Sequence, residues 1–154
     1  MSFGGEGGLR RVGLSGIHPL TRRYTLFGKM RKGQEMNQHE KLNYVEFGAK
    51  DLESTKSFFS LVFGWDFVDY GPEYTAFSNQ GLDGGFFKAD SCSQTQTGGA
   101  LLVFYSADIE STLDKVVQSG GEIVRPIFEF PGGCRFHFHE PSGNEFAVWS
   151  EVRV

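Results

Sequence analysis

Two pairs of polar side chains have the spacing of a chemical site built on strands. Tyr44 and Glu46 are two residues apart in the first half of the chain, and His137 and His139 are two residues apart near its end. Successive side chains of a strand point to opposite faces, so each pair shares one face of its strand. These four side chains are therefore the first candidates for a catalytic or binding role.

Glu46 is the candidate general base. On a sheet face lined with aromatic side chains, burial disfavours the charged carboxylate and raises its pKa toward neutral pH, where a base is most effective. Tyr44 or His137 is then its expected polar partner. In the alternative, Glu46 forms a structural ion pair with a cationic side chain or accepts hydrogen bonds from backbone donors.

The two histidines lie in an alternating run, with Phe136 and Phe138 on the opposite face of the strand. Two interpretations remain open. His137 and His139 point into a polar cleft beside Glu46, or they form the solvent face of a half-buried strand, which alternation usually indicates. A metal site made of the two histidines and Glu46 is a third alternative, and it requires a convergence that the sequence does not fix.

For Trp149 and the two cysteines the sequence allows simpler predictions. Trp149 lies two residues beyond Ala147 and shares its face, where it either walls a ligand cleft or fills the core. Cys92 and Cys134 have neither a Cys-x-x-Cys spacing nor a Cys/His zinc spacing. Without a secretory segment, two cysteines predict free thiols in a reducing cytoplasm.

Hydrophobic periodicity predicts the elements that position these residues. In the first half of the regular sequence we expect a helix at about 52–62 and strands at 42–47, 65–69, 74–78 and 84–88. Asp51 is placed to cap the helix, because its carboxylate can accept hydrogen bonds from the free N–H groups of the first turn. Gly64 is placed to end it. A polar linker follows at 90–99.

The same pattern then recurs 57 residues later. Asp51-Leu52-Glu53-Ser54-Thr55 is matched by Asp108-Ile109-Glu110-Ser111-Thr112, and Gly64 is matched by Gly121. Further strands are expected at 123–126, 135–139 and 145–150. Such self-similarity is evidence for a duplicated unit. It predicts an α+β fold of two βαβββ modules, at about 41–90 and 99–151, that form a curved mixed sheet with a central cleft.

Two short motifs add a family resemblance. Glu140-Pro141-Ser142-Gly143-Asn144 precedes the last expected strand, and Phe63-Gly64-Trp65 follows the first helix. Together with the tandem modules, residues 41–151 resemble the glyoxalase / bleomycin-resistance / extradiol-dioxygenase group, the vicinal oxygen chelate superfamily. The Phe-Gly-Trp motif resembles its lactoylglutathione-lyase-related branch. Glu140 stands where the family's turn usually has Asp.

The resemblance also implies where a metal ion binds. Metal-dependent members place a His or Glu seven residues before each helix-capping acid, and a Glu seven residues after the acid of the turn. Here those positions hold Tyr44, Leu101 and Ala147, and the matching strand at 84–89 contains no acid or His. A divalent ion needs three or four converging donors. We therefore expect neither the family's metal centre nor another cofactor.

Charge divides the chain into two segments. Residues 1–35 hold seven bases against two acids, a net charge of +5, whereas residues 36–154 hold eight against seventeen, a net charge of −9. The Gly- and Arg-rich first segment has no apolar period and is expected to lie outside the core. Residues 36–154 are expected to form one domain. Its acidic body argues against nucleic-acid binding, and no apolar run is long enough for a membrane span.

The favoured function is the metal-independent binding of a small hydrophobic or aromatic molecule. The alternative is a metal-independent lyase or isomerase with Glu46 as general base. A nucleic-acid-associated role carried by residues 1–35 is a third interpretation. We also expect a homodimer, because incomplete barrels leave strand edges that need cover. The expected ligand-binding residues are Tyr44, Glu46, Phe86, Leu101, His137, His139, Ala147 and Trp149.

Overall fold

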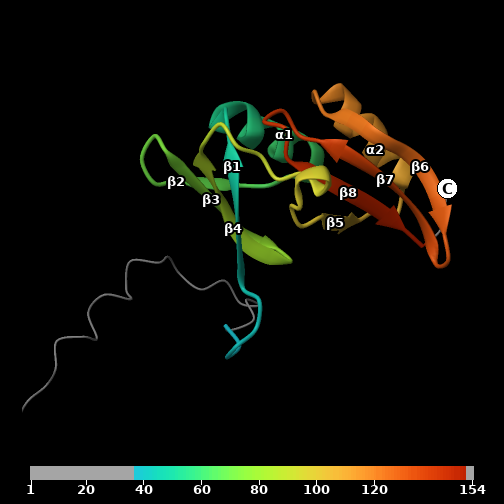
Figure 1. Cartoon of the computed structure of the whole chain (residues 1–154), viewed down its shortest axis with the longest axis horizontal. Coiled ribbons are helices and arrows are strands. Elements are labelled where there is room, and N and C mark those ends of the chain that lie inside the picture. The colour runs from blue at the N-terminus through green and yellow to red at the C-terminus, as the bar shows by residue number, and fades with distance from the viewer. Residues whose placement is uncertain (1–36, 152–154) are drawn as a thin grey trace, which may run out of the picture. The chain divides into compact units, whose positions relative to one another are not determined.

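A computed structural model of the chain describes residues 37–151, which belong to a unit that spans Met36–Val154. Two modules with the same order of elements follow each other along this part of the chain (Figure 1). The first consists of β1 (Tyr44–Ala49), α1 (Leu52–Phe63), β2 (Phe67–Asp69), β3 (Tyr74–Gln80) and β4 (Leu82–Lys88). The second consists of β5 (Leu102–Tyr105), α2 (Ile109–Gln118), β6 (Glu122–Phe130), β7 (Gly133–His139) and β8 (Glu145–Ser150).

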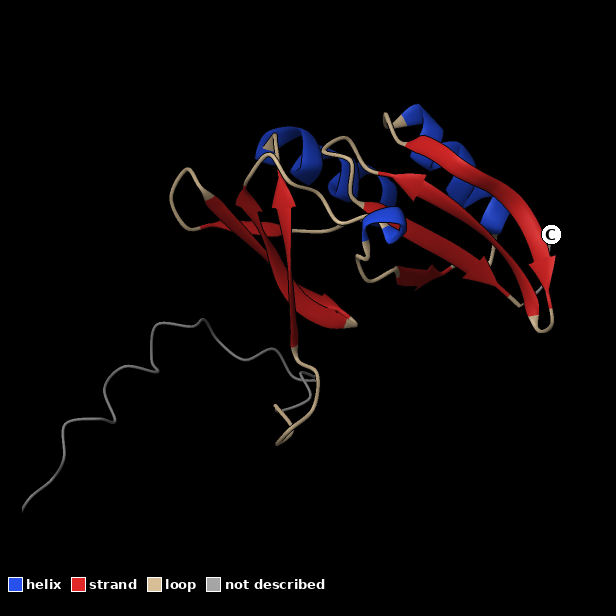
Figure 2. Ribbon diagram, viewed as in Figure 1, coloured by secondary structure: helices blue, strands red, loops and turns tan. Residues whose placement is uncertain are grey.

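Each module forms a four-stranded mixed sheet. The strand orders are β1-β4-β3-β2 and β5-β8-β7-β6, so equivalent strands occupy equivalent places. The first strand of each module runs parallel to the last, and the other pairs are antiparallel. A short 3₁₀ helix, η1 (Thr95–Thr97), lies in the loop between the modules (Figure 2). The predicted α+β fold of two βαβββ modules is confirmed. Within residues 37–151 no helix is long and apolar enough to cross a membrane.

The helix ends follow from their capping residues. The Asp51 carboxylate accepts from the backbone N–H groups of Glu53 and Ser54, and Asp108 accepts from that of Ser111 in the same way. Gly64 ends α1 in the left-handed region, with φ of 69°, which costs glycine little because it has no Cβ. The match between Gly64 and Gly121 does not extend to conformation, because Ser119 caps α2 and Gly121 instead approaches Val116 closely.

One core serves both modules. Phe59 of α1 is fully buried, and its ring lies 5.4 Å from the ring of Phe86 in the first sheet and 5.4 Å from that of Phe146 in the second. Phe63 of α1 stacks on Phe104 of β5 at 4.2 Å. Burying an aromatic side chain of this size stabilises a fold by roughly 1.5–3 kcal/mol. Helix α1 therefore joins the two modules as well as covering its own sheet.

A buried polar network also joins the modules. The Glu140 carboxylate accepts from the Asn144 backbone N–H at 3.1 Å and from the Thr55 hydroxyl of α1 at 2.8 Å. The Asn144 side-chain amide donates to the Gly48 carbonyl of β1 at 2.8 Å. These contacts explain the Glu140–Asn144 motif, because an acid at its start closes the turn and an amide at its end reaches across to the first module.

Alternation along the strands separates a core face from a helix-free face in each sheet. Tyr44 and Glu46 share one face of β1, as their spacing predicts, while Val45 and Phe47 on the opposite face contribute to the core. The first helix-free face carries Tyr44, Glu46, Val68, Tyr74, Ala76, Asp83, Gly85 and Phe87. The second helix-free face carries Val103, Tyr105, Glu122, Arg125, Phe128, Phe130, Arg135, His137, His139, Glu145, Ala147 and Trp149. These two faces are the places where a site can form.

Candidate functional site

The first helix-free face holds a chain of hydrogen bonds. The Tyr44 and Tyr74 hydroxyl oxygens are 2.7 Å apart, and the Tyr74 hydroxyl donates to Glu46 Oε1 at 2.9 Å. Burial, followed by the hydrogen bonds to Tyr44 and Glu46, raises the pKa of Tyr74, which therefore stays protonated. A Cβ at Gly85 would collide with the Tyr74 hydroxyl, so the glycine makes room for this chain.

Glu46 does not lie in the environment that we expected. Its side chain is exposed, and its hydrogen-bond partner is Tyr74 and not a histidine. Burial was the physical reason to expect a raised pKa, so the argument for Glu46 as a buried base is wrong. The expected ion pair is also absent, because within residues 37–151 no cation lies at ion-pair distance from Glu46.

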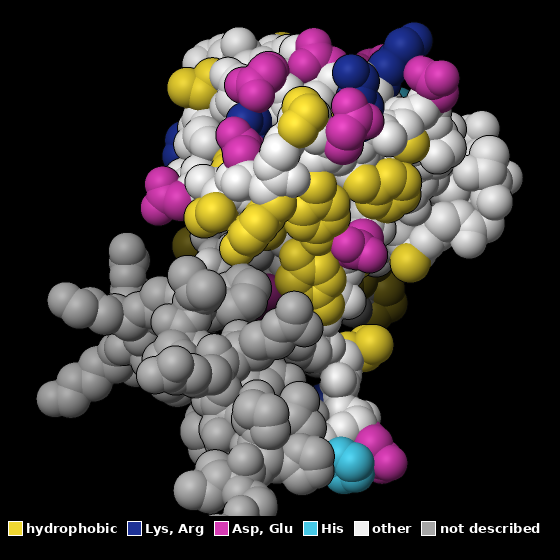
Figure 3. Space-filling model, turned by 90° about the vertical axis from the view of Figure 1, so that its left-hand side faces the viewer, with side chains coloured by type: hydrophobic (Ala, Val, Ile, Leu, Met, Phe, Trp, Pro, Cys, Tyr) yellow, Lys and Arg dark blue, Asp and Glu magenta, His cyan; other side chains and the backbone are white. Residues whose placement is uncertain are grey.

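Apolar side chains surround this hydrogen-bonded chain. Tyr44 is 46% exposed, Phe87 is 40% exposed and Val68 is 59% exposed. Viewed from the side of the first module, hydrophobic side chains gather in a patch, with acidic and basic side chains above it (Figure 3). The first helix-free face is therefore open to solvent and largely apolar.

The second helix-free face has a buried ionic centre. His137 Nδ1 lies 3.1 Å from Glu145 Oε1, and the Glu145 side chain is 5% exposed. Glu145 Oε2 accepts from both the backbone N–H and the hydroxyl of Thr95, each at 2.7 Å. Burial alone would raise the pKa of Glu145, but the hydrogen bonds from Thr95 and His137 outweigh it and lower that pKa. The carboxylate is therefore ionised at neutral pH.

An ionised Glu145 fixes the state of His137. Because the carboxylate can only accept, Nδ1 of the imidazole carries the proton between them. The other ring nitrogen, Nε2, is buried and has no hydrogen-bond partner. In the neutral imidazole this nitrogen has a free lone pair and can take a proton; in the imidazolium it can donate one. This arrangement of an oriented imidazole and a carboxylate is the one used for acid–base chemistry.

Aromatic and cationic side chains lie around this pair. The Arg125 guanidinium lies 3.4 Å from the centre of the Phe128 ring, and the Arg135 guanidinium lies 5.2 Å from it. The Trp149 ring lies 5.3 Å from that of Tyr105, which is 58% exposed. Cations over aromatic faces and stacked rings are both usual components of ligand sites.

Several expected ligand residues do share this second face. His137 and Ala147 are direct partners across the β7–β8 ladder, and Trp149 follows on the same side of β8. Trp149 is outside the core cluster, so the alternative in which it fills the core is wrong. His139 also lies on this face, with Nδ1 3.9 Å from the exposed Glu122 carboxylate.

Two of the other expected residues differ from Trp149 in their surroundings. Phe86 is fully buried among the core phenylalanines, on the core face of β4, so its expected role in ligand binding is wrong. Leu101 is half-buried and directly precedes β5.

Sequence reasoning missed the partners of His137. The alternation that grouped His137 with His139 also puts Arg135 on the same face, and the turn at 140–144 predicts that β8 returns beside β7. Those two signals were sufficient to find Arg135 and Glu145. Thr95 could not be found in this way, because it reaches Glu145 from a loop without periodicity.

Most of the described part of the chain matches one protein family. A model described as Glyoxalase/Bleomycin resistance protein/Dioxygenase superfamily matches residues 41–148. The chain belongs to this superfamily. The match covers both modules and confirms the resemblance drawn from the two motifs.

Relatives in the superfamily have diverged widely in sequence. The "Putative glyoxylase CFP32" of Mycobacterium tuberculosis (strain CDC 1551 / Oshkosh) is 26% identical over 125 residues. The match covers 72% of this chain and 46% of that protein. The same figures hold for its counterpart in Mycobacterium bovis. The chain thus spans about half the length of these relatives.

Solved structures share the fold of the superfamily. The fosfomycin resistance protein FosX from Listeria monocytogenes aligns with a TM-score of 0.62 at 19% identity, over 73% of this chain and 94% of that one. A lactoylglutathione lyase from Agrobacterium tumefaciens aligns with a TM-score of 0.55 at 17% identity, over 74% and 96% of the two chains. At these identities the likeness establishes the architecture alone.

The donor set does not fit the metal ion of the metal-dependent superfamily members. Leu101 and Ala147, at two of the ligand positions, have only carbon atoms in their side chains. Tyr44, at a third, shares a hydrogen bond with Tyr74. In the described part of the chain, no group of three or more His, Cys, Asp and Glu side chains could hold a metal ion. The alternative site made of His137, His139 and Glu46 is therefore wrong.

Proposed function

We propose that the protein binds a small hydrophobic or aromatic molecule on the second helix-free face, without a metal ion. The observation that carries this proposal is the surroundings of Ala147, which occupies a metal-ligand position of the superfamily. Ala147 is fully buried, and its ladder partners are His137 on one side and the exposed Val103 on the other. Ala147 itself is covered, so a ligand at this position would meet the exposed Val103 beside the His137 imidazole.

Exposed apolar surface supports this location. Val103 is 45% exposed and Tyr105 is 58% exposed, whereas Ala147 and Glu145 on the same sheet face are buried. Covering apolar surface contributes roughly 25 cal/mol per Å². A planar ring placed on Val103, Tyr105 and Trp149 would cover this surface, while the polar groups of β7 would orient it.

Tyr105→Ala tests the location with a matched control. The Tyr105 ring lies beside that of Trp149 on the second module. Tyr70 of the first module is similarly exposed, and the centre of its ring lies 6.4 Å from that of Tyr74. We expect 2-naphthol to bind the full chain saturably in calorimetric and NMR titrations. Tyr105→Ala should weaken that binding roughly three- to tenfold, the range of one aromatic contact, and Tyr70→Ala should leave it unchanged.

Two results of these titrations would reject the location. The first is a larger loss in Tyr70→Ala than in Tyr105→Ala, which would move the site to the first module. The second is the absence of saturable binding by any aromatic probe.

Metal independence has its own test. Elemental analysis of the purified protein should find no stoichiometric zinc, nickel, iron or manganese, and a chelator should leave 2-naphthol binding unchanged. About one tightly held ion per chain would overturn the metal-independent proposal, because a bound metal needs convergent donors.

A second candidate function is a metal-independent lyase or isomerase reaction. The observation that favours it is the His137–Glu145 pair, in which Nδ1 is held and Nε2 is free. His137 then takes the role of general base that we had expected of Glu46, with Glu145 orienting the ring. Glu46 lies on the first helix-free face, hydrogen-bonded to Tyr74, and has no part in this reaction. Turnover that is lost in His137→Gln and retained in Glu46→Gln would support this reaction.

The proposal also includes a homodimer in the cytoplasm. Tyr44, Val68 and Phe87 leave an exposed apolar surface on the first helix-free face, and such surfaces commonly bind another subunit. Cys92 and Cys134 are free thiols, which suits a reducing compartment. Light scattering at micromolar concentration should give twice the chain mass. A monomer mass would reject the dimer.

A further inference from the structure

Two buried nitrogen atoms on β7 lack partners. Arg135 Nε and His137 Nε2 are the buried side-chain nitrogen or oxygen atoms of residues 37–151 without a hydrogen bond. They belong to side chains two residues apart, so both lie on the second helix-free face. A buried donor left without an acceptor destabilises the folded state. Unpartnered buried polar atoms are rare in folded proteins, and a bound ion or water molecule is one of their explanations.

Two guanidinium groups lie around these atoms. Arg125 is the ladder partner of His137, and Phe128 is the ladder partner of Arg135. The two guanidinium groups thus approach one aromatic ring, at 3.4 Å and 5.2 Å from its centre. Within residues 37–151, no carboxylate lies at ion-pair distance from either guanidinium.

The acid nearest to this cluster is already occupied. Both oxygens of Glu145 have partners, since one accepts from Thr95 and the other lies against His137. Glu145 can therefore stabilise a positive charge on the imidazole, but it forms neither a hydrogen bond nor an ion pair with Arg135. The cluster of Arg125, Arg135 and His137, hereafter the β7 cationic cluster, keeps unsatisfied donors on the second helix-free face.

The β-ladders show which side chains lie beside this cluster across the sheet. Arg135 is opposite Trp149, and Trp149 is opposite Tyr105. Neighbouring strands lie about 4.8 Å apart, so roughly 10 Å separate the cationic row on β7 from the apolar row on β5. A molecule with a charged oxygen group at one end and a flat ring at the other matches both the order of side chains and this span.

We propose that the β7 cationic cluster is an anion subsite, which holds an oxyanion group of the ligand while its ring lies against Trp149 and Tyr105. The inference deepens the proposed function and rests on it for the aromatic part of the ligand. Arg135 supplies Nε–H and a planar fork that suits a carboxylate or phosphate, and His137 adds Nε2–H when it binds the anion as the imidazolium. The ligand class is thus an aromatic acid: a carboxylate or a phosphate on a ring system of about two fused rings.

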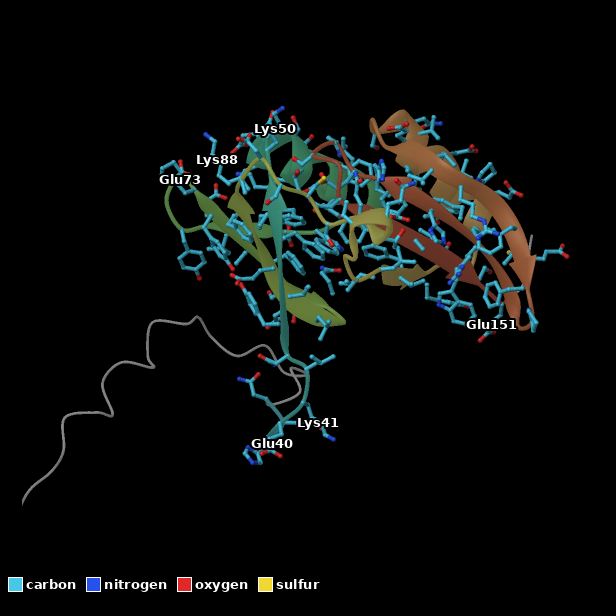
Figure 4. All side chains as sticks on the ribbon, viewed as in Figure 1. Glu40, Lys41, Lys50, Glu73, Lys88 and Glu151 are labelled. Atoms are coloured by element: carbon cyan, nitrogen blue, oxygen red, sulfur yellow. The ribbon has the colours of Figure 1, made fainter. Side chains whose placement is uncertain are left out.

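The test compares charged and uncharged probes of one shape on the full chain. Calorimetric titrations use 2-naphthoate, 2-naphthyl phosphate and 2-naphthol. The variant is Arg135→Gln, and the matched control is Lys50→Gln, which removes the same charge from an exposed side chain of the first module (Figure 4). Melting curves establish that both variants are folded.

One anionic probe should bind the parent chain at least about tenfold more tightly than 2-naphthol, as expected for a charge-assisted hydrogen bond. Arg135→Gln should reduce this preference to near unity, and Lys50→Gln should retain it. The probe with the larger preference identifies carboxylate or phosphate as the bound group. Equal affinity for charged and neutral probes, or an unchanged preference in Arg135→Gln, would overturn the anion subsite.

A second measurement separates this inference from the proposed function. Acetate and inorganic phosphate are titrated alone while the Arg135 Nε–H signal is followed by NMR. A saturable shift with no binding of any naphthalene probe supports the anion subsite and rejects the aromatic site. Binding of 2-naphthol, with no shift of the Arg135 Nε–H signal and no preference for anionic probes, supports the aromatic site and rejects the anion subsite.

Discussion

The two modules share their order of elements, their helix caps and their sheet topology, yet their helix-free faces differ. On the first, Glu46 is exposed and is reached by hydroxyl groups from its own sheet. On the second, Glu145 is buried and is paired with an imidazole. The same scaffold therefore supports a carboxylate in water and a carboxylate in the interior.

The loop between the modules causes this difference. Thr95 of η1 donates twice to Glu145, and the Glu145 backbone N–H donates to the Ser93 carbonyl at 2.8 Å. Glu46 instead lies on β1, the first strand of its module, and its hydrogen bond comes from Tyr74 of β3 in the same sheet. The comparison shows that a duplicated scaffold fixes the strands, whereas one connecting segment sets the environment of the charged groups.

The largest expected effect concerns the joint between the modules. Asn144→Ala removes the bond to Gly48 and leaves the Ser93 N–H, which donates to Asn144 Oδ1 at 2.8 Å, without an acceptor. Two unsatisfied buried groups predict a loss of about 3 kcal/mol in the free energy of unfolding. Urea unfolding measures this loss, with the exposed Asn43→Ala as a control that should change little. A loss equal to that of the control would mean that the core alone joins the modules.

The second module should lose stability when Glu145 is neutralised. Glu145→Gln replaces an acceptor that serves Thr95 and His137, and hydrogen bonds to a charged group contribute roughly 1–3 kcal/mol. Urea unfolding at pH 7 measures the loss. A variant as stable as the parent would mean that the ionic centre contributes nothing to folding.

The same variant predicts a pH dependence. The pKa of Glu145 is lower in the folded protein than its usual value, so its stabilisation is complete above the usual value and is lost as the pH falls through the folded pKa. The stability difference between parent and Glu145→Gln should therefore be constant above the usual carboxyl pKa and should shrink as the pH falls below it. A difference that stays constant as the pH falls would contradict the lowered pKa.

The first module should respond much less to the equivalent change. Glu46→Gln keeps an oxygen that can accept from Tyr74 on an exposed surface, so we expect a loss below about 1 kcal/mol. The variant should also bind 2-naphthol as the parent does. A loss as large as that of Glu145→Gln, or abolished ligand binding, would show that the two faces are more alike than their exposures suggest.

The smallest effect is expected from the basic N-terminal segment, which lies outside the described residues. We propose that residues 36–154 form the domain, and that deleting residues 1–35 changes the melting temperature by no more than a few degrees. A scanning calorimeter measures the change, and 2-naphthol binding serves as the control for an intact site. A larger drop would show that the segment contributes to the stability of the domain or its dimer.

Local rules determined the fold from the sequence. Asp51 and Gly64 set the bounds of α1 to within one residue, because caps act on the backbone beside them. Alternation sorted Phe136 and Phe138 to the core, because side chains of a strand must alternate. Strand ends were less accurate: β6 was expected at 123–126 but extends over Glu122–Phe130, since its bulges admit Pro126 on an edge strand.

The environment of each candidate side chain depended on contacts far along the chain. Period two assigns Glu46 to a face but does not say whether that face is covered, and Phe86, expected to bind a ligand, is buried in the core. His137 gains its role only because Glu145 and Thr95 converge on it from another strand and a loop. Burial and charge are properties of neighbours in space, and hydrogen bonds act over about 3 Å, so only the tertiary structure could decide which carboxylate meets an imidazole.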